Sequence, residues 1–142
     1  MEQLSKELRD TVKNLKMVYT DKIQPELLIA VPNSNKDVDY ETENFCPEFT
    51  SQCPLNPTQP DYAVIHIRYC PKDFCVELKS LKFYLNSYRE VPIFHESVPA
   101  TIMKHLINVI DPKWMTVEGK FAVRGGITTN VRAVFQGSTK GR

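Results

Sequence analysis

Apolar and polar residues alternate along three stretches of the chain, which predicts half-buried β-strands. The first covers about residues 61–69, and the other two lie on either side of a turn at Gly125-Gly126. The predicted inward residues are Ala63, Ile65, Ile67 and Tyr69 in the first strand, Met115, Val117, Phe121 and Val123 in the second, and Ile127, Thr129, Val131, Ala133 and Phe135 in the third. Clean alternation in the last pair favours an antiparallel sheet.

Apolar residues at helical spacing predict two helices between these strands. A helix over about residues 78–89 is expected to bury Leu78, Leu81, Leu85 and Tyr88. A helix over about 97–110 has a broader apolar face, which is formed by Val98, Ile102, Met103, Leu106, Val109 and Ile110. Ser97 is its predicted N-cap, Pro99 fits the first turn, and Asp111-Pro112 ends it.

The first half of the chain gives weaker patterns. Residues 1–15 carry many charges and predict a peripheral helix or mobile arm, within an arm that extends over residues 1–30. Residues 31–37 are turn-forming, and 38–44 predict a strand. Four prolines predict that residues 46–60 form a long, stiffened loop without regular structure. The order strand, strand, helix, helix, strand, strand predicts an α+β fold with two helices on one face of the sheet.

The composition fits one domain over residues 1–142, with 42% hydrophobic and 25% charged residues. The formal net charge of +1 gives no global field for nucleic acid or for an acidic membrane. The first ten residues carry mixed charge and do not resemble a signal peptide, and no run is long enough to span a bilayer. We therefore expect a cytoplasmic protein, whose cysteines are candidate catalytic or metal-binding groups before they are candidate disulfides.

Cys53 is the first candidate for chemistry. A thiol needs a partner that manages protons, because its ordinary pKa near 8.5 leaves little thiolate at neutral pH. Asp61 closes the same loop and could supply that partner. A small buried apolar role is the alternative for Cys53. The spacings of Cys46 with Cys53 and of Cys70 with Cys75 lack the tight C-x2-C pairs of a structural zinc site, and packing explains Cys70 and Cys75 better.

A basic stripe forms the second candidate. Lys79 and Lys82 lie one turn apart on the predicted helix, and Arg124 precedes the Gly-Gly turn, so the three could bind phosphate oxygens. A solvated helix face is the alternative. Third, His95-Glu96 precedes the second helix, where a carboxylate can accept two hydrogen bonds from a guanine-like edge or simply favour the helix dipole.

Together these motifs resemble the unimodular family of NADPH-dependent nitrile reductases that act on 7-cyano-7-deazaguanine in queuosine biosynthesis. The resemblance spans roughly residues 38–127. The residues that carry it are Glu77-Leu78-Lys79-Ser80-Leu81-Lys82-Phe83-Tyr84, the loop Phe45–Pro54, Gln59-Pro60-Asp61, Phe94-His95-Glu96 and Gly119-Lys120-Phe121-Ala122-Val123-Arg124-Gly125-Gly126. The first 30 residues and the C-terminal tail after Gln136-Gly137-Ser138 diverge from the family pattern.

The resemblance implies a tunnelling fold, ββααββ, whose subunits join their sheets into a β-barrel ring. It implies a homo-oligomer, usually a decamer of two stacked pentamers, with active sites between subunits. The implied substrate is a small molecule, with no direct nucleic acid or membrane partner and no metal.

The resemblance also assigns roles to residues. Cys53 would add to the nitrile and form a covalent thioimide, and Asp61 would protonate the nitrile nitrogen. Two NADPH would then reduce the adduct to the aminomethyl product. The residues implied to bind the deazaguanine are Val76, Glu77, Leu78, His95 and Glu96, and those implied to bind the NADPH phosphates are Lys79, Lys82 and Arg124. In this pattern Cys46 is not the nucleophile.

Two rival functions stay open on the sequence. A sister group adds ammonia to the same nitrile on tRNA, and by resemblance it shares the Cys and the Asp but lacks the lysine-rich helix motif. A non-catalytic zinc-binding domain that uses the four cysteines is the rival from another class.

Overall fold

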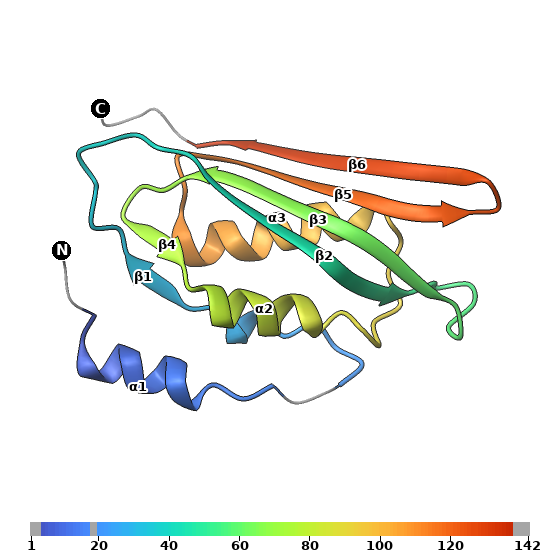
Figure 1. Ribbon diagram of the computed structural model, residues 1–142, viewed down its shortest axis with the longest axis horizontal. Helices are drawn as coiled ribbons and strands as arrows, with labels where there is room; N and C mark the ends of the chain where they lie inside the picture. The colour runs from blue at the N-terminus through green and yellow to red at the C-terminus, as the bar shows by residue number, and fades with distance from the viewer. Residues whose placement is uncertain (1–3, 18–19, 138–142) are drawn as a thin grey trace.

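Four long strands form one antiparallel sheet in the computed structural model, which describes residues 4–17 and 20–137 (Figure 1). The sheet order is β2-β3-β5-β6, so neighbours in the sheet follow one another along the chain. The strands are β2 Thr42–Gln52, β3 Pro60–Cys70, β5 Trp114–Arg124 and β6 Ile127–Gln136, and the helices α2 Leu78–Asn86 and α3 Ser97–Ile110 lie between β3 and β5 in the sequence. The predicted α+β order of two strands, two helices and two strands is confirmed.

Smaller elements surround this frame. Helix α1, Lys6–Asn14, is capped by the Ser5 hydroxyl, which accepts from Leu8 N–H at 3.1 Å, and none of its residues is buried. A 3-10 turn, η1, covers Pro25–Leu27, and the short strands β1, Ala30–Pro32, and β4, Phe74–Val76, pair antiparallel. The turn predicted from residue 31 therefore begins after Pro32. Residues 1–3 and 18–19 of the predicted arm, and the tail from residue 138, lie outside the described residues.

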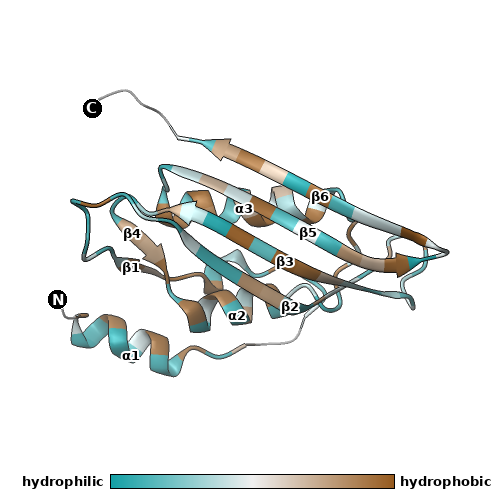
Figure 2. Ribbon diagram, turned by 45° about the horizontal axis from the view of Figure 1, so that its top comes forward, coloured by the Kyte–Doolittle hydropathy of each residue, from teal (hydrophilic) through white to brown (hydrophobic). Residues whose placement is uncertain are grey.

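The core lies between one face of the sheet and the two helices. Figure 2 shows the alternating hydropathy along the strands that creates this buried face. The predicted inward residues of β3 are all at most 5% exposed, whereas Tyr62 and Val64 on the other face are exposed. The largest fully buried side chains of the helices and of β5 include Tyr84, Tyr88, Ile102, Leu106, Ile110, Met115 and Val117. Within residues 4–17 and 20–137, no helix combines the length and apolar character needed to cross a membrane.

The prediction for residues 38–60 is wrong in its boundaries. Strand β2 occupies much of the segment that four prolines led us to expect as a loop, and only about residues 53–59 remain irregular. Pro47 lies where the β2–β3 register shifts between Cys46 and Phe49. Because β2 is an edge strand with a bulge at this point, a residue without an N–H is tolerated.

Several further predictions need correction. Leu78 is 61% exposed rather than buried, whereas Ser80 and Leu81 in the same turn are buried, so the buried face of α2 does not include its first residue. Val123 and Ile127 were also predicted to face inward but are 61% and 69% exposed, since the β5–β6 register shifts between Phe121 and Arg124 beside their turn and breaks the alternation. Ser97 is not the N-cap: Glu96 occupies that position with helical backbone angles and makes no side-chain cap.

Candidate active site

Cys53 lies immediately after β2, in a loop that the sheet holds at both ends. Its backbone N–H donates to the Gln59 carbonyl at 3.0 Å, which continues the β2–β3 ladder by one bond. The Gln59 N–H in turn donates to the Asn56 carbonyl at 2.9 Å. Pro54 and Pro57 restrict the backbone between these bonds. The thiol is therefore held in a defined place beside the start of β3.

The surroundings of Cys53 favour its ionised form. The backbone N–H of Leu55 lowers the pKa of the Cys53 thiol most, followed by the Arg124 side chain and the backbone N–H of Asn56. Cys46 shows the opposite shift, because burial raises the pKa of its thiol. The thiolate is the nucleophilic form of cysteine. Of these two thiols, Cys53 is therefore the one whose surroundings favour the nucleophilic form.

Asp61 lies at the start of β3, directly beside this loop, and is only 3% exposed. Its Oδ1 accepts a hydrogen bond from Arg124 Nη1 at 2.6 Å. His95 Nε2 lies 3.2 Å from Asp61 Oδ2, although in an orientation that makes no hydrogen bond. Cys53 and Asp61 together raise the pKa of the Arg124 guanidinium, with Cys53 the larger cause. Arg124 thus links the thiol and the carboxyl.

His95 is held by an aromatic stack. Its ring lies 3.9 Å from that of Phe121, with only 10° between the ring planes. Gly119 makes room for this arrangement, because a Cβ at that position would lie 2.8 Å from Phe121 Cε2. Stacking fixes the plane of the imidazole and leaves its edge facing Asp61.

A cavity of about 200 Å³ joins these groups. It is lined by Cys53, Pro54, Asp61, Phe94, His95, Glu96 and Arg124. The structure therefore brings together five of the residues that the sequence singled out, from the loop after β2, the start of β3, the start of α3 and the end of β5. Glu96 and Phe94 are exposed at this cavity, so its polar rim faces solvent.

Val76, Glu77 and Leu78 do not line this cavity. Val76 is buried at 4% exposure, and Glu77 caps α2. The Glu77 Oε1 and Oε2 atoms accept from the N–H groups of Lys79 and Ser80 at 2.9 and 2.7 Å. Both carboxylate oxygens of Glu77 therefore cap the N-terminus of α2.

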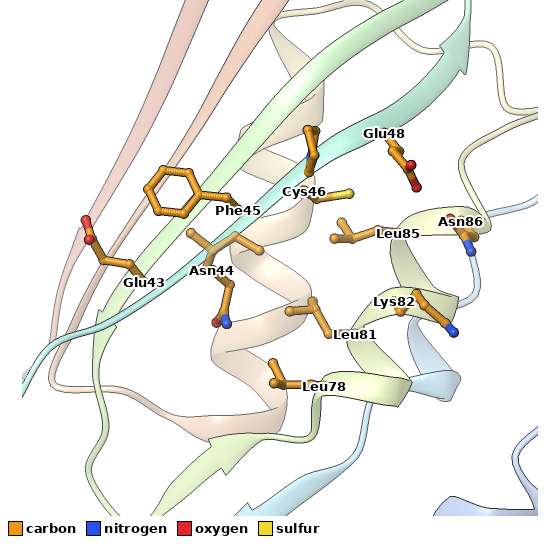
Figure 3. A pocket seen from close by; sticks show the side chains of 12 residues that line it. Glu43, Asn44, Phe45, Cys46, Glu48, Leu78, Leu81, Lys82, Leu85 and Asn86 are labelled. Atoms are coloured by element: carbon orange, nitrogen blue, oxygen red, sulfur yellow. The ribbon is translucent and has the colours of Figure 1, made fainter.

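Leu78 instead lines a second cavity, of about 520 Å³, between α2 and the edge of β2. Figure 3 shows Leu78, Leu81 and Leu85 projecting from α2 toward Asn44 and Cys46 on β2. Lys82 also belongs to this lining. The second cavity is larger than the Cys53 cavity, and three leucines of α2 line its helix wall. The only cysteine in its lining is Cys46, and the pKa of that thiol is raised.

The predicted phosphate-binding set is divided in the structure. Lys79 and Lys82 both lie near the Phe83 ring, with their Nζ atoms 5.7 and 5.2 Å from its centroid. Lys79 Nζ also donates to the carbonyls of Val12 and Lys13 at the end of α1, at 2.9 and 3.2 Å. Arg124 lines the Cys53 cavity instead.

All four cysteines are free thiols. Cys70 is buried, and Cys75 lies 3.6 Å from the Tyr40 hydroxyl. Among the described residues, no group of three or more His, Cys, Asp or Glu is placed to hold a metal ion.

Sequence reasoning missed two residues beside the cavity. Phe121 was expected only as a core residue, and its contact with His95 depends on tertiary structure. Ser51 was not considered, because its segment was expected to be irregular. In β2 it pairs directly with Asp61 and is fully buried. The signal was available in principle, since Ser51 precedes Cys53 by two residues and therefore shares its face of an extended chain.

Comparison with known proteins relates this geometry to a family. A family model described as "QueF-like protein" matches residues 60–140. Three curated relatives are named "NADPH-dependent 7-cyano-7-deazaguanine reductase". The relative from Magnetococcus marinus is 47% identical over 117 residues, which cover 81% of this chain and 91% of the relative. The relative from an Anaeromyxobacter species is 51% identical over 106 residues (75% and 86%), and that from Helicobacter acinonychis is 45% identical over 124 residues (87% and 83%).

A solved structure is also similar: the crystal structure of "the archaeosine synthase QueF-Like in the apo form". It superposes with a TM-score of 0.58 at 22% sequence identity and covers 71% of this chain and 94% of that one. At this identity the likeness concerns the fold alone.

The fold and the cavity define an α+β protein with a thiol of lowered pKa, a buried carboxyl and an imidazole at the end of its sheet. The matched relatives are named as reductases, so the class of protein is an enzyme of the oxidoreductase type. The chain belongs to the QueF-like family.

Proposed function

We propose that this protein is an NADPH-dependent nitrile reductase that converts 7-cyano-7-deazaguanine to its 7-aminomethyl product in queuosine biosynthesis. The names of relatives at 45 to 51% identity support the reaction and the cofactor. The observation that carries the mechanism is the pairing of a Cys53 thiol of lowered pKa with the Asp61 carboxyl in one cavity.

The first step is addition of Cys53 to the nitrile. The thiolate sulfur bonds to the nitrile carbon, and one π-electron pair of the C≡N bond moves to nitrogen. Asp61 supplies the proton that this nitrogen takes up, which gives a covalent thioimide. Arg124 contacts both groups, so it stabilises the thiolate before addition and the Asp61 carboxylate after proton transfer.

Reduction of the adduct requires two hydride equivalents, which NADPH supplies when it is bound. The Lys79 and Lys82 ammonium groups on α2 suit its phosphates, because both lie near one aromatic ring and form a local pair of positive charges. Lys79 also donates to two backbone carbonyls at the end of α1, so we propose that Lys82 is the lysine freer to bind the phosphates. Arg124 acts on the reacting groups in addition to, or in place of, the phosphate role predicted for it.

His95 and Glu96 are the proposed recognition groups for the deazaguanine. The stacked His95 ring borders the cavity beside Asp61, and the exposed Glu96 carboxylate can accept hydrogen bonds from an N–H/NH2 edge. Val76, Glu77 and Leu78 lie outside this cavity in one subunit. We propose that these three residues contribute to the site of a neighbouring subunit.

That arrangement requires an oligomer in which the sheets of neighbouring subunits join. The outer strands β2 and β6 each leave one edge unpaired within the described sheet. Exposed apolar residues such as Ile127 and Val134 lie on β6. Unprotected edges favour pairing with another chain. We therefore propose that subunits join β2 to β6 in a barrel ring, as a decamer of two pentamers, with active sites at the junctions.

Intact-protein mass spectrometry tests the chemistry. Incubation with 7-cyano-7-deazaguanine and no NADPH should add one substrate mass to the wild-type protein and to Cys46→Ala, but not to Cys53→Ala. NADPH oxidation with the same nitrile should then yield the amine, identified by its mass. Persistence of the adduct in Cys53→Ala would exclude the proposed nucleophile. An amidine formed from ammonia without NADPH consumption would assign the chain to the rival chemistry.

A further inference from the structure

Ser51 has a buried hydroxyl group whose role in the fold is not explained by its contacts. The residue is 0% exposed, and its Oγ has no hydrogen-bond partner within residues 4–17 and 20–137. Ser80 and Ser87 are buried as well, but each hydroxyl both accepts from a backbone N–H and donates to a carbonyl. A buried polar group costs free energy unless a partner is present, so the hydroxyl of Ser51 calls for an explanation.

The register of the sheet places Ser51 beside the proton donor. Ser51 and Asp61 are direct partners in the antiparallel β2–β3 ladder. Both are buried, as are their neighbours Phe49 and Ala63, so all four lie on the face that the helices cover. Directly opposite residues have Cβ atoms about 5 Å apart. The chain reaches Cys53 two residues after Ser51, so the strand that carries Ser51 leads directly into the loop of the proposed nucleophile.

The guanidinium beside Asp61 serves only one protonation state of this carboxyl. Arg124 approaches Oδ1 from the end of β5, and it can donate but cannot accept. His95 approaches Oδ2 from the start of α3, with Glu96 beside it, and the Cys53 thiol faces the cavity from the loop. Arg124 favours the carboxylate, whereas a proton donor must also exist as the carboxylic acid. A hydroxyl can accept from the acid and donate to the carboxylate.

We propose that Ser51 is a positioning residue that holds the Asp61 carboxyl through its proton transfer. Ser51 Oγ accepts a hydrogen bond from the protonated carboxyl before the reaction. The Cys53 sulfur bonds to the nitrile carbon, the nitrile nitrogen takes the Asp61 proton, and the Ser51 hydroxyl then turns to donate to the new carboxylate. This inference rests on the proposed function, because it gives Ser51 a role only if Asp61 is the proton donor.

The test compares two volume-matched variants, Ser51→Thr and Ser51→Val, together with Ser51→Ala. The rate of thioimide formation is followed by mass spectrometry across pH, without NADPH. Without the hydroxyl, the Asp61 carboxyl lacks this partner both before and after proton transfer. We therefore expect Ser51→Ala and Ser51→Val to be about tenfold slower at neutral pH. Ser51→Thr keeps the hydroxyl and should stay within about threefold of the wild type.

Thr50→Ala is the local control, since Thr50 pairs with Tyr62 on the opposite face of β2 and should leave the profile unchanged. Thermal melting verifies that each variant folds. An unaltered rate in Ser51→Ala would overturn the inference, as would equal slowing of Ser51→Thr and Ser51→Val, which indicates packing alone. Absence of any adduct in the wild type contradicts the proposed function itself and is therefore distinguishable from these results.

Discussion

Cys46 and Cys53 belong to the same segment of chain, yet their surroundings shift the two thiol pKa values in opposite directions. Cys46 lies within β2 and packs against the core under the apolar side of α2. Cys53 lies just beyond the strand, where two backbone N–H groups and the Arg124 guanidinium face its sulfur. The larger cavity contains the thiol whose pKa is raised. The direction of the pKa shift therefore follows hydrogen-bond donors and charge rather than the size of the cavity.

Alkylation with iodoacetamide measures this contrast directly. Because the thiolate reacts and the thiol does not, Cys53 should be modified about 100-fold faster than Cys46 near neutral pH. The lowered pKa keeps the reaction of Cys53 fast at pH values where Cys46 is still protonated. Peptide mapping by mass spectrometry gives the two rates in one sample. Equal rates for both cysteines would contradict the assignment of the nucleophile.

Replacing Arg124 should reduce the difference between the thiols. Arg124→Gln removes a cation that lowers the pKa of the Cys53 thiol, so that pKa should rise. We expect alkylation of Cys53 to be about tenfold slower at neutral pH and to approach the wild-type rate at high pH, where the thiol ionises in both proteins. Cys46 serves as the internal control, and its rate should not change.

A pH profile for Cys53 that is the same in Arg124→Gln and in the wild type would show that the Leu55 and Asn56 N–H groups alone tune this thiol. Arg124→Lys keeps the charge but not the fork of N–H donors, so its profile should lie between the two.

The smallest expected effect concerns stability. Cys46→Ser places a hydroxyl in an apolar, half-buried position and should lower the free energy of unfolding by about 1 kcal/mol. Cys53→Ser faces backbone donors and solvent, and we expect a change of less than about 0.5 kcal/mol. Urea unfolding of both variants at equal protein concentration provides the comparison. A greater loss in Cys53→Ser would mean that the loop, rather than the core, depends on its thiol.

Strong periodicity allowed the central elements to be predicted from the sequence. The inward residues of β3 are buried as expected, and α3 ends at Asp111, whose backbone adopts the left-handed conformation. The prediction failed where the tertiary structure overrode a local sequence pattern. Pro47 indicated a loop, but an edge strand with a bulge accepts it. Val123 fitted the alternation, but a register shift turned it outward.

The candidate site shows the same division. Cys53 with Asp61, and His95 with Glu96, were predicted as local pairs, and all four line one cavity. Sequence spacing could not show whether Arg124 lies near Lys79 and Lys82, because Arg124 belongs to a distant segment of the chain. Arg124 instead contacts Asp61, and Lys79 binds carbonyls at the end of α1. Such contacts join residues far apart in the chain, for which a single sequence contains no distance information.

The sequence by itself determined the reactive residue types, the order of the elements and the family, because these are written in side-chain chemistry, periodicity and motifs. The family motif implied Cys53 rather than Cys46 as the nucleophile, but only the tertiary structure decided how the surroundings shift the pKa of each thiol. The pKa of a thiol depends on donors and charges within a few ångströms of its sulfur. At Cys53 these include a guanidinium from the far end of β5, and at Cys46 they are replaced by an apolar helix wall. The same fold set Ser51 against Asp61, a pairing that exists only once β2 and β3 are in register.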